Sequence, residues 1–143
     1  TTVFTNGVFD VIHRGHIDYL YKASLKADKL IIGINSDNSV KQLEKGDDRP
    51  INKQDDRAYF LAALGFVDAV LVFDEETPLG LIREIKPTVL VKGGDYNPLA
   101  QPDDKKYIVG SDFVRSYGGT VDVIPFLPGY STTALLEKIR KTY

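Results

Sequence analysis

Two histidines, His13 and His16, are the residues of this chain whose type and spacing most clearly predict chemistry. They are its only histidines, and Arg14 and Gly15 separate them. Side chains three residues apart share one face of a helical turn, so the imidazoles should lie together. Imidazole donates hydrogen bonds to phosphate in either protonation state, and Gly15 would admit a ligand close to the backbone. With the free N–H groups of a helix N-terminus, the pair predicts a site for a nucleoside triphosphate attacked at its α-phosphate.

Two other interpretations of the histidine pair stay open. Each imidazole alone fits an ordinary packing or surface role, and the pair would also suit a metal ion. No third ligand lies at helical spacing, which disfavours the metal. Because both histidines fall in one turn after an apolar strand, beside Gly15, the pattern favours the phosphate site over packing.

The positions of apolar residues alternate between strand and helix patterns along the whole chain. The expected strands and helices are as follows: strands over 2–5, 30–34, 69–73, 89–91 and 121–124; helices over about 16–27, from a cap at Asp55-Asp56, from an N-cap at Thr77 with Pro78 first in the helix, over 103–117, and from an N-cap at Ser131 with Leu135, Leu136 and Ile139 facing inward. Two stretches, about 38–54 and 93–103, are expected to be irregular.

This alternation predicts an α/β fold: a doubly wound five-stranded parallel sheet with helices on both faces, forming one domain over 1–143. Ligands bind such sheets beyond the carboxyl ends of the strands. Four polar or glycine-rich segments follow strands and should converge on one rim: 6–16, 35–37, 92–96 and 128–133.

Composition excludes several classes of protein. The net charge of −2 gives no general footprint for nucleic acid or membrane surfaces, and no apolar run is long enough to cross a bilayer. The absence of cysteine excludes disulfides, thiol nucleophiles and zinc–thiolate sites, and fits a cytoplasmic protein. The absence of methionine indicates that the natural start lies outside this chain, so we expect a short preceding segment or a fused domain.

The segment Thr5-Asn6-Gly7-Val8-Phe9-Asp10, with His13-Arg14-Gly15-His16, resembles the signature of the cytidylyltransferase-like nucleotidyltransferases. Ser131-Thr132-Thr133 resembles their second signature. Three further stretches are similar to the adenylyltransferase domain of bifunctional ADP-heptose synthesis enzymes: Asn35-Ser36-Asp37, Asp48-Arg49-Pro50 and Val91-Lys92-Gly93-Gly94-Asp95-Tyr96. The resemblance covers nearly the whole chain.

The resemblance implies that a sugar-phosphate oxygen attacks the α-phosphate of a nucleoside triphosphate and that pyrophosphate leaves. It implies that His13 and His16 stabilise the charge on the α-phosphate and the leaving group. It also implies nucleotide binding along the first signature, by Thr5, Asn6, Gly7, Phe9 and Gly15. The 38–54 loop would border the acceptor site, where Lys45 and Arg49 would hold the sugar phosphate.

Other residues suggest roles through their own chemistry. Lys92 and Gly93 follow a buried strand at a ligand-binding edge, with Asp95 and Tyr96 placed to touch ribose or base. The hydroxyls and N–H groups of Ser131, Thr132 and Thr133 could hold the β- and γ-phosphates, although a plain helix cap explains the serine equally.

Two more residues have open roles. Arg57 is either a surface arginine or a phosphate ligand, and Asp10 would hold the acceptor or orient an imidazole. Since the chain shows no dense carboxylate cluster, Mg²⁺ is expected to be bound mainly through the triphosphate rather than by a protein metal site.

These expectations lead to an adenylyltransferase that joins AMP from ATP to a sugar 1-phosphate such as D-glycero-β-D-manno-heptose 1-phosphate. A cytidylyltransferase that uses CTP and glycerol 3-phosphate is the nearest alternative. The best-known cytidylyltransferases carry Arg and Glu where Phe126 and Pro128 stand here, which disfavours cytidine. A non-catalytic nucleotide-binding module is a second alternative.

A dinucleotide oxidoreductase is disfavoured, because the first turn lacks the pattern G-x-G-x-x-G. The expected partners are small molecules, with a fused or separate sugar kinase domain. A homodimer stays open, with Phe66 and Phe73 as apolar residues that its interface would use.

Overall fold

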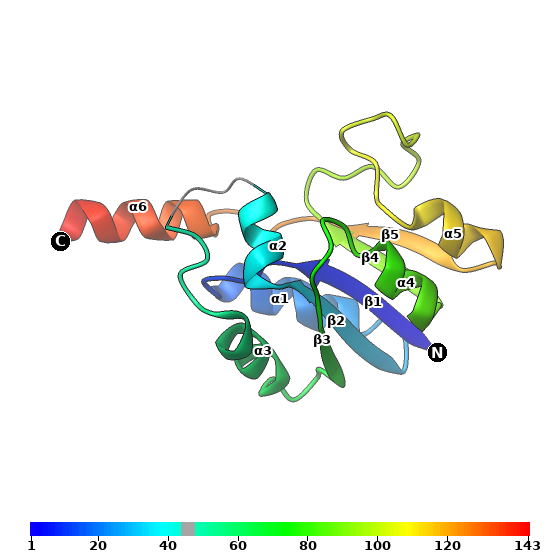
Figure 1. The fold of residues 1–143 in the computed structure, drawn as a ribbon, viewed down its shortest axis with the longest axis horizontal. Helices are drawn as coiled ribbons and strands as arrows, with labels where there is room; N and C mark the ends of the chain where they lie inside the picture. Colours follow the sequence, from blue (N-terminus) through cyan, green and yellow to red (C-terminus); the bar gives the residue numbers. More distant parts are fainter. Residues whose placement is uncertain (44–47) are drawn as a thin grey trace.

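The computed structural model describes residues 1–43 and 48–143. Its centre is a sheet of five parallel strands in the order β3-β2-β1-β4-β5 (Figure 1). The strands are β1 (Thr2–Gly7), β2 (Lys29–Asn35), β3 (Ala69–Phe73), β4 (Val89–Gly93) and β5 (Thr120–Ile124). After β3 the chain returns to place β4 on the other side of β1, so the strand order reverses between β1 and β4 and the expected doubly wound fold is confirmed.

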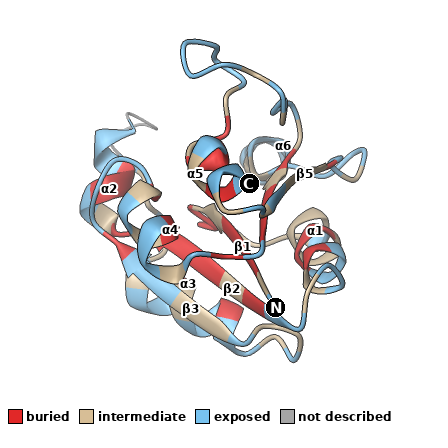
Figure 2. Ribbon diagram, turned by 90° about the vertical axis from the view of Figure 1, so that its right-hand side faces the viewer, coloured by how far each residue is buried: buried red, intermediate tan, exposed pale blue. Residues whose placement is uncertain are grey.

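The helices are α1 (Arg14–Ser24), α2 (Asp37–Gln42), α3 (Gln54–Ala62), α4 (Leu79–Ile85), α5 (Ser111–Ser116) and α6 (Thr132–Thr142). Side chains on each strand point alternately to the two faces of the sheet, which separates the core into two apolar clusters. Val3 packs with Leu20 of α1 and Leu61 of α3, whereas Phe4 packs with Ile82 of α4 and Val114 of α5. Figure 2 shows the buried residues gathered along the central strands between these helices.

Several predicted boundaries are wrong by a few residues, and two regions differ in kind. Helix α1 begins two residues earlier than expected, at Arg14, and ends at Ser24. The stretch expected to be irregular from 38 contains α2, whose N-cap Ser36 accepts a hydrogen bond from the N–H of Ser39. The helix expected over 103–117 is only α5, because 101–107 forms isolated turns such as the one closed by Tyr107 N–H and Asp104 C=O.

The caps of three helices also differ from the predictions. Lys53 is the N-cap of α3 and makes no side-chain cap bond, so Asp55 and Asp56 lie in the first turn rather than at the cap. Pro78, not Thr77, is the N-cap of α4. Ser131 does cap α6, yet this helix has no buried residue and extends away from the sheet in Figure 1, so its predicted inward face is wrong.

Neither phenylalanine expected at a dimer interface is a freely exposed surface residue. Phe73 is 4% exposed, and Phe66 packs against the cluster that contains Leu61. Within the residues that the structure describes, no helix is long and apolar enough to cross a membrane.

Candidate functional site

The two histidines form the first turn of α1. His13 is the N-cap, and its Nδ1 accepts a hydrogen bond of 3.0 Å from the N–H of Gly15. His16 Nδ1 in turn accepts one of 3.2 Å from the N–H of His13. This reciprocal arrangement is a capping box in which both side chains are imidazoles. The rings lie together, as the spacing predicted, and they stack with their centroids 3.9 Å apart.

These bonds decide which ring nitrogen carries the proton. Because both Nδ1 atoms accept, each neutral imidazole must carry its proton on Nε2 and donate from there. Burial lowers the pKa of His13, and burial together with the charge of His13 lowers the pKa of His16 to about 4. Without ligand, the pair therefore offers two neutral N–H donors at neutral pH.

Position 15 has no room for a side chain, which accounts for the glycine there. A Cβ at this position would lie 2.8 Å from His13 Cε1 and 3.1 Å from Tyr130 Cβ, which is too close for either. Gly15 therefore lets the backbone of α1 lie against the His13 ring and the Cβ of Tyr130.

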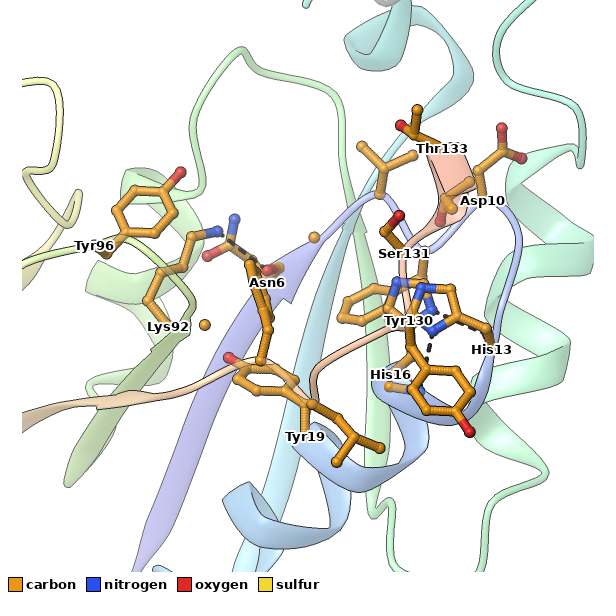
Figure 3. A pocket seen from close by; sticks show the side chains of 18 of the residues that line it. Asn6, Asp10, His13, His16, Tyr19, Lys92, Tyr96, Tyr130, Ser131 and Thr133 are labelled. Carbon is orange, nitrogen blue, oxygen red and sulfur yellow. Dashed lines mark hydrogen bonds between the residues drawn. The ribbon is translucent and has the colours of Figure 1, made fainter. Parts of the chain in front are cut away.

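The histidines line a cavity of about 370 Å³, called here the first pocket, at the carboxyl ends of β1 and β4 (Figure 3). In Figure 3, Lys92, Tyr96 and Asn6 lie on one side, and His13, Tyr130 and Ser131 lie on the other. The predicted site residues that line this pocket are Asn6, Gly7, Phe9, Asp10, His13, Gly15, His16, Arg49, Lys92, Gly93, Tyr96, Ser131, Thr132 and Thr133. The predicted convergence of 6–16, 92–96 and 128–133 is thus confirmed, whereas 35–37 does not reach this pocket.

Lys92 is anchored at the end of β4. Its Nζ donates to the C=O of Asn6 at 3.2 Å and lies 5.2 Å from the centre of the Tyr96 ring. These contacts tie the ends of β1 and β4 together and hold a positive charge at the edge of the first pocket.

Asp10 is buried and ties a distant segment to the end of β1. Its carboxylate accepts hydrogen bonds from Arg49 Nε at 2.6 Å and from the N–H groups of Ile51 and Asn52 at 2.8 and 2.7 Å. Burial alone would raise the pKa of Asp10, but these donors outweigh it and lower the pKa. Of the two roles predicted for Asp10, orienting an imidazole is wrong, since its oxygens face the 49–52 segment instead, and holding the acceptor stays a prediction. Arg49 is thereby held in the same pocket as the histidines.

The N-terminus of α6 closes the pocket on the histidine side. Ser131 Oγ accepts a hydrogen bond of 3.0 Å from the N–H of Ala134, so the serine acts as a helix cap. Thr132 Oγ1 donates to the C=O of Val11 at 3.3 Å, which fastens this helix to the loop before α1. The three residues therefore lie on the pocket wall with the positive end of an eleven-residue helix beside them.

Of the predicted ligands that the structure describes, Thr5, Asp95 and Arg57 do not line the first pocket. Thr5 is fully buried, and its hydroxyl shares a 2.5 Å hydrogen bond with Tyr19. Asp95 is exposed outside the pocket lining. Lys45, the remaining predicted ligand of the acceptor, lies outside the described residues.

Arg57 is the clearest correction. It is 0% exposed and holds four groups: the C=O of Val8, of Asn35 and of Asn52, and the carboxylate of Asp37 at 2.8 Å. All of these guanidinium bonds go to groups of the protein, because three loops at the strand ends converge on this side chain. Arg57 is therefore a structural centre and not a phosphate ligand.

Five residues of the pocket were not among the predicted site residues: Val8, Tyr19, Phe126, Leu127 and Tyr130. Tyr19 follows His16 by three residues on α1, so helical spacing was a usable signal for it. Phe126 covers the turn at Gly93 and Gly94, where a Cβ on Gly94 would lie only 2.0 Å from its ring. Since Gly94 also has a φ of 74°, this turn requires glycine for two independent reasons.

The lowered pKa of His16 predicts how stability changes with pH. Neutral His16 keeps its capping bond, so its stabilisation is complete above pH 6.5 and is lost as the pH falls from 6.5 toward about 4. The variant H16Q keeps a capping acceptor and does not titrate. We expect the Tm of the wild type to fall more steeply than that of H16Q over this interval. Parallel Tm profiles from pH 8 to pH 4 would contradict the assignment.

Comparison with known proteins shows the family of this chain. Residues 4–138 match the family described as Cytidylyltransferase-like. The chain belongs to this family, and it is a nucleotidyltransferase.

Individual relatives share about half of their aligned residues with this chain. The chain is 50% identical over 141 residues to the "Bifunctional protein HldE" of Geobacter metallireducens and 54% identical over 140 residues to that of Campylobacter fetus. These matches cover 99% and 98% of this chain but only 27% and 28% of the relatives. The chain thus spans little more than a quarter of their length. The resemblance to the bifunctional enzymes that the motifs predicted is confirmed.

Solved structures share the fold. A lipopolysaccharide core biosynthesis protein from Thermoplasma volcanium aligns over 88% of this chain and 95% of its own, with a TM-score of 0.67 and 25% identity. The pantothenate synthetase of Thermus thermophilus aligns over 88% of this chain and 56% of its own, with a TM-score of 0.55. At 16% identity, the second likeness concerns the fold alone.

Proposed function

We propose that this protein transfers AMP from ATP to a sugar 1-phosphate, most specifically D-glycero-β-D-manno-heptose 1-phosphate, and releases pyrophosphate. The observation that carries the proposal is the histidine pair, whose Nε2–H donors are fixed by the capping box at the head of α1. The identity to bifunctional relatives over almost the whole chain supports the choice of an adenylyl group and a heptose phosphate.

The chemistry needs positioning more than proton transfer. A sugar phosphate is largely deprotonated at neutral pH, because its second pKa lies near 6. One of its oxygens forms the new bond to the α-phosphorus, the bond from that phosphorus to the bridging oxygen breaks, and the electron pair leaves with pyrophosphate. No general base is required. His13 and His16 would donate to the α-phosphate oxygens as charge shifts toward the leaving group.

In this proposal, different positive groups of the first pocket contact different phosphates of the triphosphate. Lys92 at the end of β4 would meet the α-phosphate side, and Arg49 would meet the opposite side while Asp10 holds its Nε. The N–H groups at the head of α6 would hold the β- and γ-phosphates. Mg²⁺ would arrive on the triphosphate, since no three His, Asp or Glu of the described residues gather into a metal site.

The base is the least constrained part of the substrate. Phe126, Leu127 and Tyr130 give the first pocket an aromatic and apolar side that suits a purine ring. The arginine and glutamate expected of a cytidylyltransferase are replaced here by Phe126 and Pro128. These features favour ATP over CTP.

The larger assembly is part of the proposal. The relatives are about four times longer than this chain and are named bifunctional, so we propose that a sugar kinase domain, fused or separate, supplies the sugar 1-phosphate. A homodimer and a cytoplasmic location belong to the same proposal.

The direct test is pyrophosphate release with ATP or CTP, each offered heptose 1-phosphate or glycerol 3-phosphate in the presence of Mg²⁺. We expect release with ATP and the heptose phosphate alone. Release only with CTP would overturn the choice of nucleotide while keeping the histidine mechanism. Nucleotide binding with no release from any pair would instead favour a binding module.

A further inference from the structure

A second cavity of about 460 Å³ lies next to the first pocket and is called here the second pocket. The two share Asn6, Gly7, Val8, Lys92 and Tyr96, so the ends of β1 and β4 form the border between them. The second pocket extends from this border over Asn35 at the end of β2 and the start of α4 at Pro78. Its volume lies in the range of about 300–1,000 Å³ that is usual for small-molecule sites.

The lining of the second pocket suits an anionic polyol. Lys92 and Lys105 supply positive charge for a phosphate group. Glu76, Thr77 and Tyr107 supply acceptors and hydroxyls that match those of a sugar. The apolar side chains of Ile108 and Val109 provide a wall for the carbon skeleton.

The position of Arg49 does not support the acceptor site that the sequence analysis expected, and Lys45, the other ligand predicted for it, lies outside the described residues. The sequence analysis placed the acceptor beside the 38–54 loop, with Arg49 as one of its ligands. Arg49 lies instead in the first pocket and is bonded to buried Asp10. Of the described residues in 38–54, only Leu43 lines the second pocket.

We propose that the second pocket binds the sugar-phosphate acceptor, with its phosphate at the Lys92 border and its hydroxyls toward Glu76 and Tyr107, and that Lys105 holds it there. This inference rests on the proposed function. An acceptor seated this way presents a phosphate oxygen across the border to an α-phosphate in the first pocket. The segment between β4 and α5, which carries Lys105 and rises above the sheet in Figure 1, then sets acceptor selectivity.

The chain offers a matched pair of lysines for the test. Lys105 lines the second pocket, whereas its neighbour Lys106 is equally exposed and does not. The hydrogen bonds at Lys106 use its backbone N–H and C=O, so replacing its side chain leaves them in place. We expect K105Q to raise the KM for heptose 1-phosphate by about tenfold, as for the loss of one charge-assisted bond, and to leave the KM for ATP within about twofold. We expect K106Q to change neither constant.

A blocking variant gives an independent result. Thr77 is an exposed residue of the second pocket, and T77W would fill part of that space. We expect T77W to raise the KM for the acceptor strongly while ATP still binds. Equal acceptor KM values in wild type, K105Q and T77W would overturn the proposal, as would an equal effect of K105Q and K106Q.

Failure of the proposed function would look different. In that case the wild type itself releases no pyrophosphate with any acceptor. Calorimetric titration of heptose 1-phosphate into protein saturated with a non-hydrolysable ATP analogue then tests, without turnover, whether the second pocket binds the acceptor. Binding to wild type and K106Q that is weakened in K105Q supports the site, and absence of binding to the wild type overturns it.

Discussion

Replacing His16 by alanine is expected to lower kcat for pyrophosphate release by about 100- to 1000-fold, the loss typical of one preorganised donor to a developing oxyanion. The reason is geometric. His16 accepts from the N–H of His13 through Nδ1, so its Nε2–H is committed to donation before any ligand arrives. Stacking on His13 at 3.9 Å and the edge contact with Phe9 at 5.4 Å hold the ring in this orientation.

The measurement must separate chemistry from folding, because His16 also closes the capping box. Loss of a helix cap costs about 0.5–2 kcal/mol, which would lower the Tm of H16A without affecting the chemical step. H16Q restores a capping acceptor and serves as the control for stability. We expect H16Q to keep the Tm near that of the wild type and still to lose most of the kcat. Wild-type turnover in H16A would refute the catalytic role.

The KM for ATP gives a second readout. A donor that strengthens only in the transition state changes kcat with little effect on substrate binding. We therefore expect nucleotide titration of H16A to give an affinity close to that of the wild type. If H16A instead bound ATP about 100- to 1000-fold more weakly and kept the wild-type kcat, His16 would serve in binding alone.

The replacement R57M is expected to destabilise the fold by about 2–6 kcal/mol, because a buried acceptor left without its donor costs about 1–3 kcal/mol and the buried carbonyls of Val8 and Asn35 both lose theirs. Arg57 is fully buried, and its loss leaves three carbonyl groups and the Asp37 carboxylate without their donor. Asp37 also accepts from the N–H of Gln54 at 2.9 Å, so the start of α3 loosens together with α2. Methionine fits the volume but donates nothing.

Urea unfolding measures this effect, and an exposed arginine provides the control. Arg140 lies 3.6 Å from Asp48, with both side chains more than two-thirds exposed. Such surface pairs contribute about 0–1 kcal/mol, so R140M should leave the free energy of unfolding nearly unchanged. R57K is expected to fall between R57M and the wild type, because an ammonium cannot span all four acceptors. Equal stability of R57M and R140M would refute the structural role.

Local signals in the sequence predicted the order of the elements and the centre of the site. Apolar runs identified all five strands, since strands buried on both faces show continuous hydrophobicity. The spacing of His13 and His16 predicted that the two imidazoles lie together, and the capping box between residues three apart holds them there. Ser131 was recognisable as a cap for the same reason: its partner, the N–H of Ala134, is three residues away.

Signals of longer range were read wrongly or not at all. Arg57 looked like a phosphate ligand because it is charged and follows a loop, but its acceptors Val8 and Asn35 are 49 and 22 residues away. Thr5 belongs to the first signature, yet its hydroxyl is hydrogen-bonded to the hydroxyl of Tyr19 on α1 and does not reach the first pocket. Asp10 does line the first pocket, but the partners that orient its carboxylate, Arg49, Ile51 and Asn52, lie about forty residues further along the chain.

The sequence by itself thus determined which elements form, in which order, and that two imidazoles share one helical turn. These properties depend on hydrophobic period and on contacts within a few residues. Only the tertiary structure decided which polar side chains face a cavity and which are consumed in holding the loops. That choice depends on carbonyls and carboxylates that the strand crossovers bring together, and it also created the second pocket, whose lining comes from six separate segments of the chain between Asn6 and Val109.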